Sequence, residues 1–394
     1  MKRLIGYALT QPLFVVLGTL LFILAGVTAF RNLSVEAFPD VTDTQVTIIA
    51  LYPGRAAEEV EKQVTLPIEV AVSGLPNALR VFSHTQFGLS YTVITYDDKA
   101  EVMTARQQVN ERLRGVDLPP GVEANIAPNS TPVGEVMRYR LRGDGYSATD
   151  VRTVEDWVVE RTLRQVPGVA DVVAMGGAIK QYEVQPDLDK LRAYKLTFQN
   201  LLDALGRGNS NAGGSYVAQG AQQYAIRGIG LLASADDIGR IVLTSRGGTP
   251  ILIRDVAQVK VGAVPRLGVV GQDADDDIVT GIVVMRKGEN PSEVLKGIKQ
   301  KITALNEKGL PPGMKIEPYY DRTWLMGKTL STVFRNLVEG AVLVSIVLYL
   351  FLSNIRASLA VVVIIPLALL STFLGLKIMG VPANLLSLGA MDFG

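Results

Sequence analysis

The chain has 394 residues, of which 39 are lysine or arginine and 38 are aspartate or glutamate. This near-balance of charge gives no reason to expect nucleic acid as a partner. Cysteine is absent, and His84 is the single histidine. Disulfides, thiolate metal sites, cysteine nucleophiles and histidine-based triads are therefore excluded. Hydrophobic residues make up 48% of the chain, and their long runs lie towards its two ends.

The first apolar run, residues 11–31, follows a short basic segment, residues 1–10. Gln11 to Phe30 contains no charged residue, and at 1.5 Å per residue such a helix is about 30 Å long, the thickness of a bilayer core. A cleaved signal peptide is the alternative, because Lys2 and Arg3 form a basic start. Apolar cores of signal peptides are usually shorter, so we predict a membrane span.

A second apolar block begins near Leu337. It contains two further predicted spans, residues 337–353 and 357–379, and the start of a fourth helix at residues 384–394. A backbone that ends at membrane depth would leave carbonyl groups unpaired in hydrocarbon. We therefore expect this chain to be the N-terminal part of a longer, multi-span protein.

The basic residues beside these runs predict the orientation in the membrane. Lys2 and Arg3 precede the first span, and Arg356 lies in the short loop between the second and third spans. Basic loops stay on the cytoplasmic side. The large region between the first two spans is therefore expected to face outward.

The beginning of this outer region, residues 32–178, has the patterns of a soluble α+β domain. Residues 44–51 read as a strand, 56–72 as a helix, 79–96 as two strands around Gly88, and 101–114 as a helix. With a final strand, this order is that of a split βαβ, ferredoxin-like unit.

The same pattern then starts again and is interrupted. A strand at 137–141, a helix at 149–165 and a strand at 171–174 are matched much later by a strand at 278–285 and a helix at 291–305. We predict a second ferredoxin-like unit that closes in residues 271–336. Residues 179–270, which are rich in glycine, are predicted to form an inserted subdomain with hairpins.

Several motifs, in this order and spacing, are similar to those of one transporter family. They are Val35-Glu36-Ala37-Phe38-Pro39-Asp40-Val41, Tyr52-Pro53-Gly54-Arg55-Ala56-Ala57-Glu58-Glu59-Val60-Glu61, Phe351-Leu352-Ser353-Asn354-Ile355-Arg356-Ala357-Ser358, Ile365-Pro366-Leu367-Ala368-Leu369-Leu370-Ser371 and the final run Asn384 to Gly394 with its Asp392-Phe393-Gly394. The whole chain resembles the heavy-metal efflux branch of the resistance-nodulation-division (RND) transporters.

The resemblance implies an α-helical membrane protein with large periplasmic α+β porter subdomains and an inserted docking subdomain. It implies a homotrimer in the bacterial inner membrane, surrounded by lipid, with a periplasmic adaptor protein and an outer-membrane channel as partners. The implied activity is not enzymatic. It is export of a divalent metal ion, such as zinc, cobalt or nickel, by proton antiport, with no cofactor.

Asp392 is the candidate proton carrier. It lies in the apolar run that begins near Asn384, and a carboxylate in such a run costs about 2.5–3.5 kcal/mol on insertion scales, so it is functional by default. The resemblance assigns the matching aspartate to proton translocation. The alternative is that this run is not a membrane span, or that Asp392 lies near the membrane interface.

Glu135 and Asp171 are the candidate metal ligands. They match two positions at which the resemblance places metal-binding carboxylates in a cleft of the porter region. Oxygen ligands suit divalent ions better than Cu(I), which prefers sulfur. The alternative is a pair of ordinary surface acids. The run Asp273, Asp275, Asp276 and Asp277 lacks the glycine and terminal glutamate of a calcium-binding loop, so we interpret it as a solvated turn.

Two other functions remain open from the sequence. Export of drugs or amphiphiles would fit the same superfamily, although aromatic residues make up only 7% of the chain. A membrane-tethered periplasmic sensor or assembly factor would not need an ionisable residue inside a span, and Asp392 argues against it.

Overall fold

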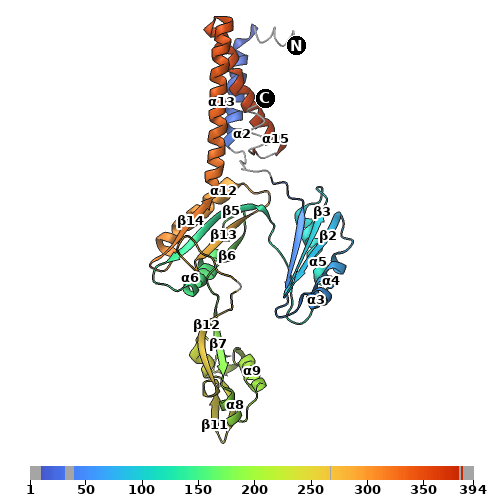
Figure 1. Cartoon of the computed structure of the whole chain (residues 1–394), viewed down its shortest axis with the longest axis vertical. Coiled ribbons are helices and arrows are strands. Elements are labelled where there is room, and N and C mark those ends of the chain that lie inside the picture. Colours follow the sequence, from blue (N-terminus) through green and yellow to red (C-terminus); the bar gives the residue numbers. More distant parts are fainter. Residues whose placement is uncertain (1–9, 32–39, 267, 381–382, 385–394) are drawn as a thin grey trace.

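The computed structural model describes residues 10–31, 40–266, 268–380 and 383–384. Long helices lie at one end of the molecule, two α+β units lie side by side in the middle, and the inserted subdomain lies at the far end (Figure 1). The chain runs from the helical end through both units and the insertion before it returns to the helices.

The first α+β unit, the first unit below, has the predicted split βαβ topology. Its elements are β1 Gln45–Leu51, α3 Ala57–Val60, η1 Glu61–Thr65, α4 Leu66–Val72, β2 Ala78–Gln86, β3 Leu89–Tyr96, α5 Val102–Leu113 and β4 Ala124–Ile126. The strands are antiparallel in the order β2-β3-β1-β4. This is the ferredoxin-like order, so the prediction for this unit is confirmed.

The sequence of the first unit explains its layers. Val46, Ile48 and Ala50 alternate along β1 and are buried, which is the period that points every second side chain to one face of a strand. They pack against Val60, Val64, Ile68 and Val72, which recur at the spacing of one helix face, and against Val109 of α5. The two helical segments therefore cover one face of the sheet.

The second α+β unit, the second unit below, repeats this topology. Its elements are β5 Ser130–Gly143, α6 Ala148–Val154, η2 Glu155–Val159, α7 Glu160–Leu163, β6 Val169–Met175, β13 Val279–Arg286, α12 Pro291–Ala304, η3 Leu305–Gly309 and β14 Met314–Asp321. The sheet order is β14-β5-β13-β6, again antiparallel. The closing strand β14 was not predicted.

The helices of the second unit cover only one face of its sheet. Met137, Tyr139 and Leu141 of β5 and Val283 of β13 face these helices and are buried. The opposite face carries Arg138, Ile282 and other residues that are exposed or half-buried. We call this second surface the open face.

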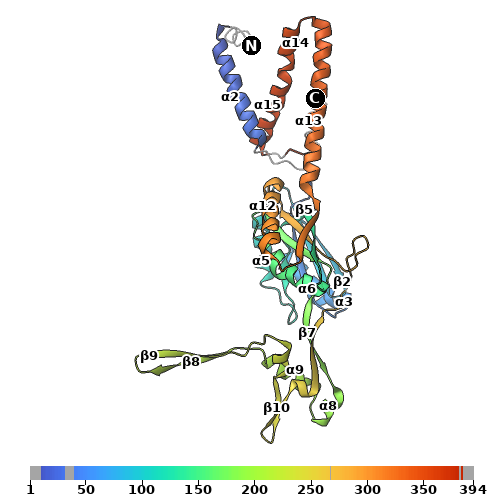
Figure 2. The same cartoon turned by 90° about the vertical axis from the view of Figure 1, so that its left-hand side faces the viewer.

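The insertion connects β6 to β13. It contains β7 Lys180–Pro186, α8 Leu188–Ala193, α9 Phe198–Arg207, β8 Ala212–Gln219, β9 Gln222–Gly228, α10 Ala235–Gly239, β10 Val242–Arg246, β11 Thr249–Leu252, α11 Ile253–Val256 and β12 Ala257–Ala263. Strands β7 and β12 pair along their whole length and form the stem of the subdomain. The β8–β9 hairpin extends sideways from it (Figure 2), with every residue of both strands exposed.

The helical end contains α2 Pro12–Arg31, α13 Arg322–Leu352, α14 Ile355–Val362 and α15 Ile364–Met379. Of the described helices, one, α2, is both long and apolar enough to cross a bilayer, and Val338–Phe351 and Ile364–Met379 are shorter apolar stretches. Helix α2 packs against α15, where the rings of Phe30 and Phe373 are 4.8 Å apart.

Two of the predicted spans have different helical limits in the structure. The predicted span 337–353 lies in α13 except for its last residue, Ser353. The helix begins at Arg322 because Asp321 caps it by accepting a hydrogen bond from the Thr323 amide at 2.8 Å. Residues 357–379 are divided at Val363. Pro366 has no amide hydrogen to donate to the preceding helical turn, which accounts for the break. The predicted fourth helix, 384–394, lies almost wholly outside the described residues.

Candidate functional site

Glu135 lies on the open face of the second unit because of a β-bulge in β5. Val283 pairs with Met137, whereas the next residue, Val284, pairs with Glu135, so Val136 is an extra residue in the strand. Val136 and Met137 are both fully buried. The extra residue reverses the alternation and directs Glu135 to the open face. Bulges of this kind often reorient side chains at functional sites.

Asp171 lies on the same row of the sheet as Glu135. It is on β6, and it pairs with Val284 from the other side of β13. Adjacent strands are about 4.8 Å apart, so the Cα atoms of Glu135 and Asp171 are about 10 Å apart across one strand. The register therefore places the two acids on one row of the sheet, on either side of β13.

Each of these carboxylates has an arginine partner. The Arg138 guanidinium binds both oxygens of Glu135, with Nη2 donating to Oε2 at 3.0 Å. The Arg164 Nε donates to Asp171 Oδ1 at 2.6 Å, and Arg164 Nη1 lies 3.0 Å from Oε1 of Glu160. Glu135 and Asp171 are thus ion-paired in this structure.

A cavity of about 720 Å³ opens beside Glu135. Its other charged linings are Arg138 and Arg322, and Tyr319 and Tyr320 contribute aromatic surface. Arg322 is buried, and it donates to the carbonyl of Val133. Sequence reasoning missed Tyr319, Tyr320 and Arg322, which come from the end of β14 and the first turn of α13. The run Tyr319-Tyr320-Asp321-Arg322 was a signal for this junction, because its aspartate is a favoured helix cap.

Among the described residues, no group of three or more histidines, aspartates or glutamates is placed to hold a metal ion. Glu135 and Asp171 supply two carboxylates across one strand, and a divalent ion takes further oxygen ligands. Asp392, the candidate proton carrier, lies outside the described residues. Its role stays a prediction.

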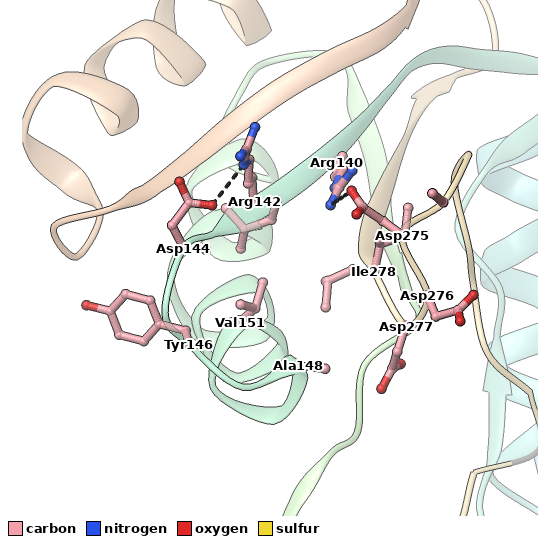
Figure 3. Close-up of a pocket in the computed structure, with 14 residues that line it drawn as sticks. Arg140, Arg142, Asp144, Tyr146, Ala148, Val151, Asp275, Asp276, Asp277 and Ile278 are labelled. Atoms are coloured by element: carbon pink, nitrogen blue, oxygen red, sulfur yellow. Dashed lines mark hydrogen bonds and ion pairs between the residues drawn. The ribbon is translucent and has the colours of Figure 1, made fainter.

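The aspartate-rich turn lies at a separate cavity of about 430 Å³ (Figure 3). There Arg140 Nη2 lies 2.7 Å from Oδ2 of Asp275, and Asp277 accepts a hydrogen bond from Arg266. Arg140, Arg142 and four aspartates are among the residues that line this cavity, and two aspartates of the turn pair with arginines. The turn that was interpreted as solvated is thus ion-paired at Asp275 and Asp277.

One acid of the second unit is buried in its core, and sequence reasoning did not single it out. Glu155 is fully buried at the start of the π-helical turn η2, where Tyr139 donates a hydrogen bond to its Oε1 at 2.5 Å. Its Oε2 has no hydrogen-bond partner. Burial raises the pKa of Glu155 to about 7, although the Tyr139 hydrogen bond acts in the opposite direction.

The repeated split βαβ units, the insertion between β6 and β13 and the flanking apolar helices match a known family. The model of the AcrB/AcrD/AcrF family matches residues 4–394. The chain belongs to this family.

Relatives and solved structures within the family place the chain more closely. It is 40% identical to the cation efflux system protein CzcA of Alcaligenes sp. (strain CT14), over 100% of this chain and 38% of that protein. It is 34% identical to the cation efflux system protein CusA of Escherichia coli (strain K12), over 98% of this chain and 37% of that protein. The crystal structure of a heavy metal efflux pump, crystal form II, superposes with a TM-score of 0.93 at 38% identity, over 99% of this chain and 39% of that one.

These comparisons confirm the resemblance to the heavy-metal efflux branch. The chain spans less than two fifths of the length of CzcA, to which it aligns from end to end.

Proposed function

We propose that this chain takes part in the proton-driven export of divalent metal cations, such as zinc, cobalt or nickel, by an RND pump. The observation that carries the proposal is the shared row of Glu135 and Asp171 on the open face of the second unit. Relatives at similar identity are named for the same chemistry, among them the cobalt-zinc-cadmium resistance protein CzcA of Cupriavidus metallidurans, at 39% identity. Carboxylate oxygens are among the ligands that bind zinc, and Cu(I) prefers sulfur ligands.

We place the pump in the inner membrane of a bacterium, with the α+β units and the insertion in the periplasm. The start of α2 and the turn between α13 and α14 lie at the same end of the helices (Figure 2). Arg356 lies beside this turn, and Lys2 and Arg3 precede α2 in the sequence. Basic residues at one end of the spans support a cytoplasmic position for that end. The apolar faces of α2, α13 and α15 are then solvated by lipid.

A homotrimer with a periplasmic adaptor and an outer-membrane channel is the proposed assembly. The β8–β9 hairpin supports contacts between subunits, because it extends away from its own chain and exposes Tyr216, Tyr224 and Ile226 to 50–70%. Large exposed aromatic residues on a projecting element are typical of protein interfaces. The insertion lies farthest from the helices (Figure 1), which suits contact with partners beyond the membrane.

Asp392 is the proposed proton carrier of this antiport. A carboxylate in an apolar membrane helix binds and releases protons when the burial of its charge changes between conformations. Such an exchange can drive transport without a cofactor, so the pump is a secondary transporter and not an enzyme.

The proposal is tested by transport in proteoliposomes that contain the intact pump. With a pH gradient imposed, a lumenal zinc-sensitive dye should report metal movement by the wild type. We expect Glu135→Gln and Asp171→Asn each to lower the initial rate at least tenfold, and Asp392→Asn to abolish it.

The matched control is Asp144→Asn. Asp144 is also paired with an arginine, Arg142, at 2.9 Å at the edge of the same unit, but it lies outside the row. Its rate should equal that of the wild type. Normal zinc transport by the Glu135→Gln/Asp171→Asn double variant would contradict the assigned substrate site, and drug-driven but not metal-driven proton flux would favour export of amphiphiles instead.

A further inference from the structure

Both candidate metal ligands are already neutralised by a cation of the same unit. Arg138 holds both oxygens of Glu135, and Arg164 binds Asp171. Arginine stays charged at every physiological pH, so this neutralisation cannot be removed by loss of a proton. A metal ion that binds Glu135 must therefore displace Arg138 from both oxygens, and one that binds Oδ1 of Asp171 must displace Arg164.

We propose that Arg138 and Arg164 are built-in competitors of the transported cation, which occupy Glu135 and Asp171 when the site is free and leave them when a divalent ion binds. This inference rests on the proposed role of the two carboxylates as metal ligands. It adds a selection step at that site, because an ion binds only if it attracts the carboxylates more strongly than the arginines do.

The surroundings of Arg164 give it a second carboxylate to hold after displacement. Its guanidinium lies between Asp171 on β6 and Glu160 on α7, with Nη1 3.0 Å from Glu160 Oε1. When Asp171 turns to a metal ion, Arg164 keeps the Glu160 ion pair. The charge of Arg164 is therefore not left unpaired, and its movement needs only a rotation of a half-exposed side chain.

The surroundings of Arg138 also offer an alternative position. Arg138 lines the cavity of about 720 Å³ together with Tyr319 and Tyr320. Tyrosine rings attract a guanidinium by a cation–π interaction within about 6 Å. The Arg138 side chain is 45% exposed, so its displacement into this cavity costs little desolvation.

The arrangement favours divalent over monovalent ions. Glu135, Asp171 and Glu160 share the two arginines, so the cluster carries one net negative charge, and a bidentate guanidinium such as that of Arg138 is among the strong partners of a carboxylate. A sodium or potassium ion carries one charge and binds carboxylates weakly, so it cannot compensate for the loss of the two arginine contacts. A divalent ion concentrates two charges between the carboxylates and can replace both.

The test is the affinity of the intact pump, purified in detergent, for Co²⁺ alone, followed by its visible absorption and by calorimetry. We expect Arg138→Gln and Arg164→Gln each to lower the dissociation constant about tenfold, since each removes one competitor. Arg138→Lys and Arg164→Lys, which keep the charge but lose the two-pronged contact, should lie between the wild type and the glutamine variants.

Arg142→Gln is the matched control. Arg142 is also on β5 and is paired with Asp144, but it lies away from the row, and its variant should bind Co²⁺ like the wild type. Unchanged or weaker binding by correctly folded Arg138→Gln and Arg164→Gln variants, judged by their thermal unfolding, would overturn the inference.

The proposed function fails in a distinguishable way. If wild-type Co²⁺ binding is insensitive to Glu135→Gln and Asp171→Asn, the carboxylates are not the ligands, and both proposals are wrong. If the carboxylate variants lose binding while the arginine variants do not gain it, the metal site stands and only the competition is refuted.

Discussion

Glu155 shows how one residue can make the stability of the second unit depend on pH. Its side chain is fully buried beside Tyr139, and Oε2 has no hydrogen-bond partner. Asp156 and Glu160 add negative charge nearby, and Arg152 only partly offsets it. Arg152 is itself held by Asp156 at 2.7 Å. Burial is the largest effect and raises the pKa of Glu155 to about 7 from an ordinary value of 4.5.

We expect Glu155→Gln to stabilise the folded protein at high pH and to have little effect at low pH. Because the folded-state pKa of Glu155 is raised, the folded state keeps a proton that the unfolded chain releases above pH 4.5. The resulting penalty grows as pH rises through this window and is complete above pH 7. At about 1.4 kcal/mol per pKa unit, removing it should add about 3 kcal/mol at pH 8.

The measurement is denaturant unfolding of wild type and Glu155→Gln between pH 4 and pH 8. The amide of glutamine can still accept the Tyr139 hydrogen bond, so the variant isolates the charge. An equal difference in unfolding free energy at both ends of this pH range would show that Glu155 does not titrate in the core.

The residues of the site were only partly predictable from the sequence. Glu135 and Asp171 were identified through the family resemblance, but their common row depends on Val136, an extra residue whose valine side chain looks like any other strand residue. The burial of Glu155 could not be predicted from the sequence for another reason. The segment Glu155-Asp156-Trp157 reads as an exposed helix turn, and only the position of η2 above Tyr139 shows that the first acid points inward.

At the scale of elements, β13 is one of the two inner strands of the second sheet, and it fits beside β5 because Gly281 has no side chain. Gly281 pairs with Tyr139 across the sheet, and a Cβ atom placed on it would lie 2.2 Å from Tyr139 Cζ. Tyr139 is itself fully buried and holds Glu155. The glycine thus provides the space for the tyrosine ring over β13.

Gly281→Ala is therefore expected to destabilise the protein by at least about 1–3 kcal/mol, the usual cost of overpacking a core. Gly213→Ala is the control, because Gly213 lies in the exposed strand β8 with no atom near its added Cβ. Chemical unfolding of both variants provides the comparison. Equal stabilities for Gly281→Ala and the wild type would mean that the tyrosine ring can move at no cost.

Most strands and helices of the two units were predicted from the periodicity of apolar residues, but β14 and the start of α13 were not. Both split βαβ patterns were visible, because alternating and helical spacings of valine and isoleucine persist through β1, α5 and α12. Strand β14 was missed, since Pro318 interrupts its pattern; the structure tolerates this proline because β14 is an edge strand. The start of α13 was missed because its first turns mix charged and apolar residues and lie outside the apolar run.

At the scale of the whole molecule, a small polar joint fixes the chain between the helical end and the first unit. Thr131 donates to Asp40 Oδ2 at 2.7 Å, and Lys287 Nζ donates to the carbonyl of Thr42 at 2.5 Å. Burial alone would raise the pKa of Asp40, but hydrogen bonds from Thr131 and Thr42 and the charge of Lys287 outweigh it and lower this pKa. The second unit therefore holds the segment that leads into β1.

We expect the Thr131→Val/Lys287→Met double variant to loosen this joint without unfolding either unit. Hydrogen bonds to charged groups contribute about 1.5–3 kcal/mol each, so amide exchange at Thr42 should accelerate at least tenfold. Amides in the paired part of β1, such as that of Ile48, should not change. Hydrogen–deuterium exchange read by mass spectrometry measures both.

Lys315→Met is the control for this experiment, because Lys315 makes only a surface ion pair with Glu317 at 3.9 Å. Unaltered exchange at Thr42 in the double variant would show that the joint is held by other contacts.

The insertion between β6 and β13 also has a consequence for the order of folding. Met175 on β6 pairs with Thr280 on β13, yet the whole insertion separates them along the chain. Pairing of such distant segments is slow, because a large loop must close first. Early formation of the stem would shorten this loop, because the pairing of Lys180 with Ala263 brings β6 and β13 close to each other. The second unit is thus expected to be completed last, after the subdomain that interrupts it.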